Sequence, residues 1–288
     1  MRVLITGARG LLGAAMMREF GDAHVHALGH QELDVADASG VMAAVAAAGP
    51  DVVINCAAYN DVDRAEQEPE TALRVNALGV LTLARAARQA NAVLVHYSTD
   101  FVFDGETDRP YTEEDPPNPR GIYATSKLLG DWFANDAPRA YVLRVESLFG
   151  EAGLAGTRRG SLGTIVDRIR TGVEVPIFVD RTVSPGYTAD IASATRAVLE
   201  RGMPGGLYHC VNAGAATWAH IAEEAARLMG RPFRMKPLTL ETANLVAPRP
   251  RYCALSTAKL AAAGIVMPTW EDALRRHLSI PNPSIANP

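Results

Sequence analysis

Two side chains four residues apart, Tyr123 and Lys127, have the types and the spacing needed to move a proton. On a helix, this spacing places both of them on one face. The pKa of a free tyrosine is about 10, which is too high for efficient proton transfer at neutral pH. A neighbouring ammonium favours the phenolate and lowers that pKa. We therefore expect Tyr123 to act as an acid–base group beside Lys127.

A second polar group, the run Tyr97-Ser98-Thr99-Asp100, follows an apolar stretch that has the pattern of a strand. Doubly wound α/β sheets bind ligands at their carboxyl edge, where such a run would emerge. A hydroxyl at that edge can hydrogen-bond a carbonyl oxygen and hold the carbonyl for hydride attack. Together with Tyr123 and Lys127, this run predicts a site that reduces a carbonyl group.

The segment Thr6-Gly7-Ala8-Arg9-Gly10-Leu11-Leu12-Gly13 joins a predicted strand to a predicted helix. Glycines three residues apart allow a tight turn, close approach of the backbone to a pyrophosphate, and close packing of helix on strand. The N-terminus of the helix then offers unpaired N–H groups to the phosphates. Because the segment opens the first βαβ unit, we interpret it as a dinucleotide-binding loop rather than as a turn without a ligand.

The residues after the second predicted strand indicate which dinucleotide is bound. A carboxylate at the end of that strand would bind the adenosine ribose and repel a 2′-phosphate, but none occurs before Glu32 and Asp34. Arg9, inside the glycine loop, can reach a 2′-phosphate, although it could also be a solvated loop charge. The sequence therefore favours NADP(H), with NAD(H) possible, and Asp34-Val35 could flank the adenine ring.

Short apolar runs alternate with longer helical patterns through the first half of the chain. Continuous apolar strands, each followed by a helix, are typical of a parallel sheet covered on both faces. We therefore predict an α/β fold with a Rossmann-type doubly wound parallel sheet. The predicted strands are 2–6, 24–28, 51–55, 92–97 and 140–144, and the predicted helices are 11–20, 38–48, 69–90 and 122–135.

After about residue 147 this alternation weakens, and prolines such as Pro176 and Pro237 interrupt the chain. Helical patterns return at 161–171, 188–200, 217–229, 256–263 and 270–278. We predict an NADP(H)-binding domain of residues 1–146 with about 180–211. A smaller, partly interleaved C-terminal substrate-binding domain would take residues 147–179 and 212–280, and the tail 281–288 has a disordered composition.

The charge balance excludes several classes of partner. With 28 Lys and Arg residues against 32 Asp and Glu residues, the net charge is -4, which gives no basic footprint for nucleic acid or an anionic membrane. No apolar run approaches the length of a membrane span, and no secretory signal follows Met1. Since Cys56, Cys210 and Cys253 form no C-x-x-C pair, we expect a cytoplasmic protein without disulfides or a zinc site.

These residues together resemble the extended short-chain dehydrogenase/reductases and, within them, the dTDP-4-dehydrorhamnose reductase group. The resemblance covers about residues 1–280. It is carried by Asn55-Cys-Ala-Ala-Tyr59, Val62-Asp-Arg-Ala-Glu66, Asn76-Ala77, Tyr97-Ser-Thr-Asp-Phe-Val-Phe103, Tyr123-x-x-x-Lys127, Pro185 in a Val-Ser-Pro-Gly-Tyr-Thr segment, and Arg249-Pro250 before Leu255. It implies NAD(P)H-dependent reduction of the C4 ketone of a nucleotide-linked 4-keto-6-deoxy sugar.

The resemblance and the loop pattern assign roles to single residues. Thr99, Tyr123 and Lys127 would be catalytic. Asp100, Phe101 and Arg249 would bind the sugar nucleotide. The predicted cofactor-binding residues are Gly7, Arg9, Gly10, Leu11, Leu12, Gly13, Asp34, Val35, Cys56, Ala57, Ala58, Tyr59, Asn76, Tyr123 and Lys127.

The chain differs from related dehydratases in one place and departs from the group in three. Phe101 stands where related dehydratases carry a glutamate, which argues against water elimination. Ser147 stands where many members carry a tryptophan that packs on a substrate ring, and Cys253 replaces a frequent serine. The run Ala14-Ala15-Met16-Met17 lacks the acidic residue that binds a bridging magnesium in some members, so we predict no metal.

Two other functions stay open at this stage. One is a nucleotide-sugar epimerase of the same fold that keeps its cofactor bound, and the other is a non-catalytic, dinucleotide-binding regulatory subunit. Arg158-Arg159 could be a phosphate clamp or a solvated charge pair. We expect a monomer or a homodimer, and the C4 configuration of the product stays open.

Overall fold

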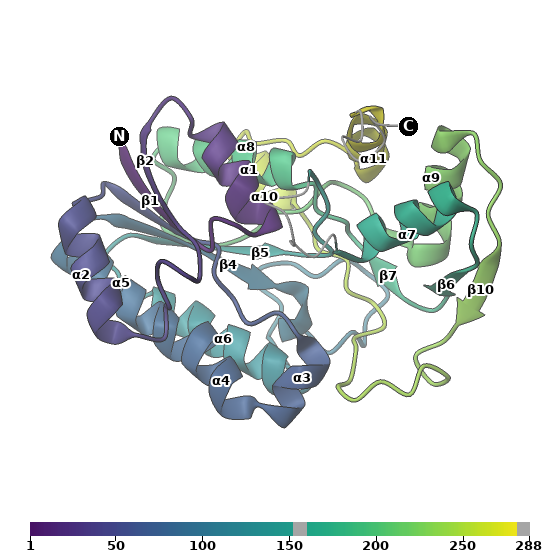
Figure 1. Cartoon of the computed structure of the whole chain (residues 1–288), viewed down its shortest axis with the longest axis horizontal. Coiled ribbons are helices and arrows are strands. Elements are labelled where there is room, and N and C mark those ends of the chain that lie inside the picture. The colour runs from purple at the N-terminus through teal and green to yellow at the C-terminus, as the bar shows by residue number, and fades with distance from the viewer. Residues whose placement is uncertain (152–159, 281–288) are drawn as a thin grey trace.

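The computed structural model describes residues 1–151 and 160–280. Within them, six parallel strands form one sheet in the order β2-β1-β3-β4-β5-β8, with helices on both faces (Figure 1). The strands are β1 (Arg2–Thr6), β2 (His24–Leu28), β3 (Val52–Asn55), β4 (Val93–Thr99), β5 (Ala140–Val145) and β8 (Gly206–His209). The first five match the predicted strands closely, so the predicted doubly wound sheet is confirmed.

The sheet lies between two apolar cores. Helices α1 (Leu11–Glu19) and α8 (Thr188–Glu200) pack on one face, and α2 (Ala38–Ala48), α5 (Gly79–Gln89) and α6 (Ile122–Ala134) cover the other (Figure 1). Successive residues of one strand enter opposite cores: Leu4 packs on the α2 side and Ile5 on the α1 side. Both positions must therefore be apolar, which explains why these strands are continuous apolar runs.

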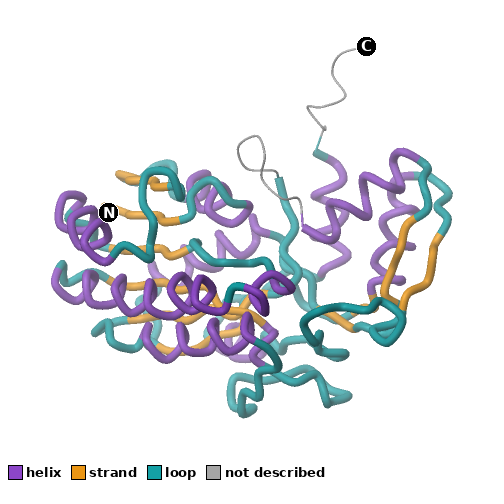
Figure 2. Tube along the Cα trace, turned by 60° about the horizontal axis from the view of Figure 1, so that its bottom comes forward, coloured by secondary structure: helices purple, strands orange, loops and turns teal. Residues whose placement is uncertain are grey.

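A second group of elements lies beyond the sheet, at the right of Figures 1 and 2. It contains the helices α7 (Gly160–Thr171), α9 (Trp218–Met229) and α11 (Trp270–Ser279) and the parallel pair β6 (Val175–Phe178) and β10 (Met235–Leu238). Its own core includes Leu162, Ile169, Trp218 and Trp270. Two short strands, β7 (Thr182–Val183) and β9 (Ala216–Thr217), pair antiparallel.

The sequence did not predict β6 and β10, because each contains a proline. Pro176 lies in β6 and Pro237 in β10. In a two-stranded sheet each strand has an unpaired edge, where a residue without an N–H costs no ladder hydrogen bond. The prolines interpreted as interruptions are therefore compatible with these two strands.

The predicted helix 69–90 is continuous, but a π-helical turn interrupts its α-helical hydrogen bonding. It divides into α4 (Pro69–Leu73), a π-helical turn (Arg74–Leu78) and α5, and the short helix α3 (Val62–Gln67) precedes it. Asp61 caps α3 by accepting a hydrogen bond from the Arg64 N–H at 3.2 Å. Single π-helical turns are frequent at functional sites, and this one contains the buried Asn76.

Two segments of the second half belong to the large sheet. Helix α8 and strand β8 lie in the range 180–211 that was assigned to the first domain. Within 212–280, Leu260, Ile265 and Met267, in and just after α10 (Ala258–Ala262), also pack in the core of the large sheet. The division into two domains stays a prediction.

Arg158-Arg159 and the tail 281–288 lie outside the described residues. In the part that the structure describes, no helix combines the length and the apolar composition needed to cross a membrane.

Candidate active site

The strand order reverses between β1 and β3, and open α/β sheets bind ligands at the carboxyl ends of such a pair. Gly7, directly after β1, has a φ of +65° and lies against the backbone that follows β3. A Cβ on Gly7 would stand 2.6 Å from the Ala57 nitrogen, and one on Gly13 would stand 2.3 Å from the Gly7 oxygen. The two glycines thus let three backbone segments meet where a side chain would clash.

A hollow of about 670 Å³ opens at this reversal point. Gly10, the N-cap of α1, carries no capping side chain, so the first N–H groups of the helix remain available for a phosphate. The predicted cofactor residues that line the hollow are Gly7, Arg9, Gly10, Asp34, Val35, Cys56, Ala57, Ala58 and Tyr59. Leu11, Leu12 and Gly13 are not among its lining residues, and Leu12 packs in the core on the α1 side.

The expectation that no acid closes the second strand is wrong. A turn after β2 folds back, so that Glu32 accepts a hydrogen bond from the Gly29 N–H at 2.9 Å. The other carboxylate oxygen of Glu32 forms an ion pair with Arg9, which also donates to the side chain of Gln31 at 3.2 Å. The guanidinium expected to bind a 2′-phosphate therefore shares one rim of the hollow with a carboxylate, which weakens the sequence argument for NADP(H) over NAD(H).

Asn76 acts on the hollow through Tyr59 rather than by lining it. Its side-chain oxygen accepts the Tyr59 N–H at 2.8 Å, and its amide nitrogen donates to the Tyr59 carbonyl at 3.0 Å. The same nitrogen donates to Ser126 on α6 at 3.0 Å. The π-helical turn thus presents Asn76 where it fixes the backbone after β3 against the helix that carries Tyr123 and Lys127.

Thr99 and Tyr123 meet at the carboxyl edge of the sheet. Thr99 ends β4, and its hydroxyl lies near that of Tyr123 on α6, close enough to affect its pKa. Burial raises the pKa of Tyr123, and the nearby Thr99 hydroxyl opposes this only in part. The predicted lowering of this pKa by Lys127 is therefore wrong, and Tyr123 keeps its proton at neutral pH. A neutral tyrosine is the form that can act as an acid.

Lys127 lies one helical turn after Tyr123 and is 2 % exposed. Its ammonium donates to the Tyr97 carbonyl at 2.5 Å. Burial lowers the pKa of Lys127 to about 8, while the nearby carboxylate of Asp131 partly opposes this effect. Near neutral pH the side chain remains mostly charged, which gives the carboxyl edge a buried positive charge close to Cys56.

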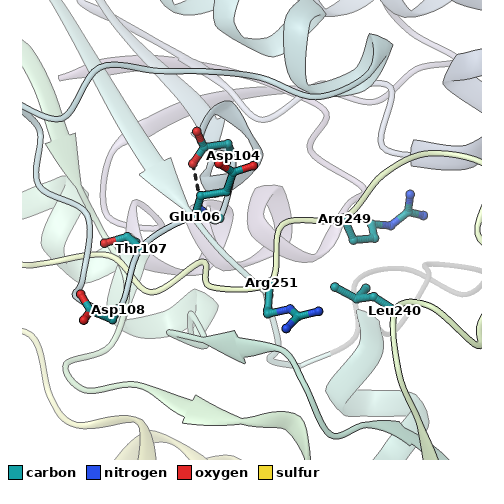
Figure 3. A pocket seen from close by; sticks show the side chains of 8 residues that line it. Asp104, Glu106, Thr107, Asp108, Leu240, Arg249 and Arg251 are labelled. Atoms are coloured by element: carbon teal, nitrogen blue, oxygen red, sulfur yellow. Dashed lines mark hydrogen bonds between the residues drawn. The ribbon is translucent and has the colours of Figure 1, made fainter.

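A second hollow, of about 680 Å³, contains the predicted substrate residue Arg249. Figure 3 shows Arg249 and Arg251 on one stretch of chain and the acidic residues Asp104, Glu106 and Asp108 on another. Arg249 forms an ion pair with Asp63 on α3 at 2.9 Å. This contact fixes a guanidinium at the hollow, where it can pair with an anionic group.

Phe101 links this hollow to Tyr123. The Arg249 guanidinium lies 5.9 Å from the centre of the Phe101 ring, and that ring meets Tyr123 edge-on at 5.6 Å. Tyr59, from the first hollow, packs in the same cluster as Tyr123. Tyr123 therefore packs with one residue that lines the first hollow, Tyr59, and with one that lies beside the guanidinium of the second, Phe101.

A buried polar cluster behind Thr99 was not predicted from the sequence. Asp100 lies within it rather than on a hollow, and its neighbours are Glu146, Arg181 and Cys253. The usable signal was position: Glu146 directly follows the apolar strand β5, just as Asp100 follows β4. Ser147, the next residue, has a φ of +44°, a left-handed backbone conformation.

The family model described as the RmlD substrate binding domain matches residues 1–281. This chain belongs to the RmlD family. A probable dTDP-4,6-dihydroxy-2-methyloxan-3-one 4-ketoreductase of Streptomyces antibioticus is 38% identical to it over 96% of this chain and 94% of its own. The dTDP-4-dehydrorhamnose reductase of Streptomyces griseus is 37% identical over 92% of this chain and 88% of its own.

A solved structure supports the same assignment. The dTDP-4-dehydrorhamnose reductase of Bacillus anthracis str. Ames, in complex with NADP, is 30% identical and superimposes with a TM-score of 0.90, covering 96% of this chain and 98% of that one. The resemblance found in the sequence is thus confirmed, and this RmlD-family chain spans nearly the full length of these relatives.

Proposed function

We propose that this protein is an NADPH-dependent reductase of the C4 ketone of a nucleotide-linked 4-keto-6-deoxy sugar. The observation that carries the proposal is that Thr99 and Tyr123 lie together at the carboxyl edge of the sheet, where Tyr123 packs with Tyr59 of the first hollow and with Phe101, which lies beside Arg249 of the second. Two relatives that match nearly the whole chain, a probable dTDP-4,6-dihydroxy-2-methyloxan-3-one 4-ketoreductase and a dTDP-4-dehydrorhamnose reductase, support the same reaction.

The residues of the first hollow fit a dinucleotide. A backbone turn that excludes side chains, followed by a helix N-terminus without a capping side chain, suits a pyrophosphate. We propose that Arg9 binds the 2′-phosphate and releases Glu32 when it does so. The related Bacillus anthracis reductase that was solved with NADP supports this preference, while Glu32 near the end of β2 leaves a partner for the ribose of NAD.

The catalytic set would be Thr99, Tyr123 and Lys127. When bound, the reduced dinucleotide supplies a hydride for the carbonyl carbon. Thr99 holds the carbonyl oxygen, and Tyr123 donates its hydroxyl proton to that oxygen as negative charge develops there. Lys127, held at the same edge by the Tyr97 carbonyl, would hydrogen-bond the nicotinamide ribose of the bound dinucleotide.

The substrate would enter from the side of the second hollow. There Arg249, held by Asp63, offers its guanidinium to the diphosphate, and Phe101 offers a ring edge and face near Tyr123. We expect the enzyme to act in the cytoplasm, where nicotinamide dinucleotides and nucleotide sugars are made, as a monomer or a homodimer.

The test is turnover by the purified protein with a panel of nucleotide-linked 4-keto-6-deoxy sugars. We expect a substrate-dependent loss of NADPH absorbance, faster than with NADH, and the configuration of the product at C4 follows from its NMR spectrum. Absence of turnover across the panel would favour a regulatory subunit. Stoichiometric NAD released from the denatured protein would favour an epimerase.

A paired substitution tests the catalytic set. Tyr123→Phe should lower kcat by at least about 100-fold and leave NADPH affinity unchanged, because it removes the proton donor alone. Tyr141→Phe is the matched control: Tyr141 is also buried, but its hydroxyl donates to the Met203 carbonyl at 2.6 Å, away from the carboxyl edge. Equal activity in the two variants would contradict the assignment.

A further inference from the structure

Two carboxyl groups leave the sheet side by side directly behind Thr99. Thr99 at the end of β4 pairs with Val145 at the end of β5, so the next residues, Asp100 and Glu146, are neighbours. Asp100 is 3 % exposed and Glu146 is 2 % exposed. One oxygen of each, Oδ2 of Asp100 and Oε1 of Glu146, is buried without a geometrically defined hydrogen bond.

A thiol and one guanidinium complete this cluster. The Cys253 thiol is close enough to interact with both carboxyl groups, and the ligand atoms of the three residues lie within 4.8 Å of one another. Arg181 donates to the Cys253 sulfur at 3.3 Å and to the Pro250 carbonyl at 3.0 Å. Since a cation already stands 3.3 Å from the thiol, the group is a poor site for a second cation.

The charges of the cluster favour one proton on its two carboxyl groups. The groups that act on the two carboxyls are Arg181, Cys253, Tyr252 and Tyr123. Only Arg181 is positive, so it can balance one carboxylate but not two. Burial raises the pKa of Asp100 to about 6, and burial together with the neighbouring Asp100 raises that of Glu146 well above its usual range.

The cluster is connected to the reacting atoms. The Thr99 hydroxyl donates to Asp100 Oδ1 at 3.0 Å and lies near the hydroxyl of Tyr123. Glu146 is held from behind by the Ser184 N–H, which donates to its Oε2 at 2.7 Å. Polar groups therefore follow one another from Glu146, whose carboxyl oxygen lies within 4.8 Å of one of Asp100, through Asp100 and Thr99 to Tyr123.

We propose that Asp100 and Glu146 share one proton at neutral pH and return it, through the Thr99 hydroxyl, to Tyr123 after each turnover. The proposal rests on the proposed ketone reduction. In that reaction the O–H bond of Tyr123 breaks and its proton goes to the substrate oxygen. The phenolate then takes the Thr99 proton, Thr99 takes the proton shared by the carboxyls, and the pair regains one from water. Glu146 is thus a positioning residue that acts through Asp100.

The first test is the pH profile of kcat. In the wild-type protein kcat should fall at high pH, once the pair loses its proton. Glu146→Gln keeps an oxygen for the Ser184 N–H but leaves Asp100 alone with Arg181, so Asp100 holds its proton less tightly. The fall of kcat at high pH should therefore begin at a lower pH in Glu146→Gln than in the wild-type protein. For each pH unit of this shift, kcat of the variant at a given pH in the falling part of the profile should be about tenfold lower than that of the wild type. Glu146→Asp should restore the wild-type profile in part.

The matched control is Glu113→Gln. Glu113 also accepts a hydrogen bond from one backbone N–H, that of His209 at 2.8 Å. Within the part of the chain that the structure describes, it forms no hydrogen bond with Thr99. Its profile should follow that of the wild-type protein. A uniform loss of kcat in Glu146→Gln without a shift of the fall to lower pH would show a structural role only and would overturn the proposal.

The second test needs no turnover, so it separates this proposal from the proposed function. Infrared spectra of the wild-type protein at neutral pH should contain the C=O band of a protonated carboxyl group. That band should be lost in Glu146→Gln, stay in Glu113→Gln, and vanish from the wild-type protein over the pH range in which kcat falls. A band that survives Glu146→Gln, or none in the wild type, overturns the shared proton. An inactive wild-type protein that keeps the band contradicts the proposed function instead.

Discussion

Lys127 should make the fold less stable than a neutral side chain would. Its pKa falls from the 10.5 of an exposed lysine to about 8, because burial disfavours the ammonium. Each pKa unit corresponds to about 1.4 kcal/mol, so holding the charge inside costs the fold about 3 kcal/mol near neutral pH. Lys127→Met removes this cost but also removes the hydrogen bond to the Tyr97 carbonyl, which is worth about 1 kcal/mol. We therefore expect Lys127→Met to raise the free energy of unfolding by about 2 kcal/mol.

The pH dependence isolates this effect. Below pH 8, Lys127 is protonated in both the folded and the unfolded chain, and the cost is complete. Between about 8 and 10.5 the unfolded chain binds the additional proton, so the stability of the wild-type protein gains from rising pH. The gain ends above 10.5, where Lys127 is neutral in both states. The advantage of Lys127→Met should therefore shrink as pH rises through this window.

The assay is urea unfolding of both proteins, without dinucleotide, at a series of pH values. Other buried groups, such as Tyr97 and Cys56, also titrate in this range, but they contribute to both proteins and largely cancel in the difference. Two curves that stay parallel from neutral to alkaline pH would refute the reasoning. A wild-type protein more stable than Lys127→Met at neutral pH would refute it as well.

Two further predictions concern the framework of the site. Asp131 and Arg144 form a buried ion pair at 3.2 Å. Asp131→Asn leaves the guanidinium without its anion, so it should lower the free energy of unfolding, measured by urea titration, by about 3–5 kcal/mol. A loss below about 1 kcal/mol would mean that the pair is not desolvated. Gly7→Ala should abolish NADPH binding in fluorescence titrations, because its Cβ would stand 2.6 Å from the Ala57 nitrogen. Gly172 also has a left-handed φ, +71°, but no atom lies within 4 Å of the Cβ that an alanine would add there. Gly172→Ala should therefore cost only about 1 kcal/mol of stability and leave NADPH binding intact. Equal NADPH binding by the two variants would contradict the clash at Gly7.

The sequence predicted the sheet because local pattern and global burial agree there. Leu4 and Ile5 enter opposite cores, so the inner strands carry nearly continuous apolar runs that are easy to find, whereas the edge strand β2 leaves His24 and His26 exposed. The strands β6 and β10 were missed because an isolated pair does not need such a pattern and tolerates Pro176 and Pro237. The turn that returns Glu32 to Gly29 was missed because it depends on side-chain hydrogen bonds, which have no periodicity.

The site divides in the same way. The glycine loop and the Tyr123–Lys127 spacing are local features, and the structure places Gly7 at the reversal point and Tyr123 beside Thr99. The pKa of Tyr123 is not a local feature. Spacing suggested that Lys127 would lower it, but burial dominates and raises it, and Lys127 is directed to the Tyr97 carbonyl. A contact inferred from helical spacing therefore says which groups are near, whereas their protonation depends on how much of each is removed from water.

The substitution at Phe101 shows what the fold adds to a motif. The sequence has Phe101 where related dehydratases carry a second acid directly after Asp100, which indicated that this site has one carboxyl group. The structure supplies a second one from the neighbouring strand, because β4 and β5 end in register and bring Glu146 beside Asp100. Glu146, however, lines neither hollow and is held by the Ser184 N–H, away from the substrate. A carboxyl group in that position can change the chemistry only by changing the protonation of Asp100. The absence of an acid at position 101 therefore still argues against water elimination. Glu146 is instead consistent with the proposed return of a proton to Tyr123.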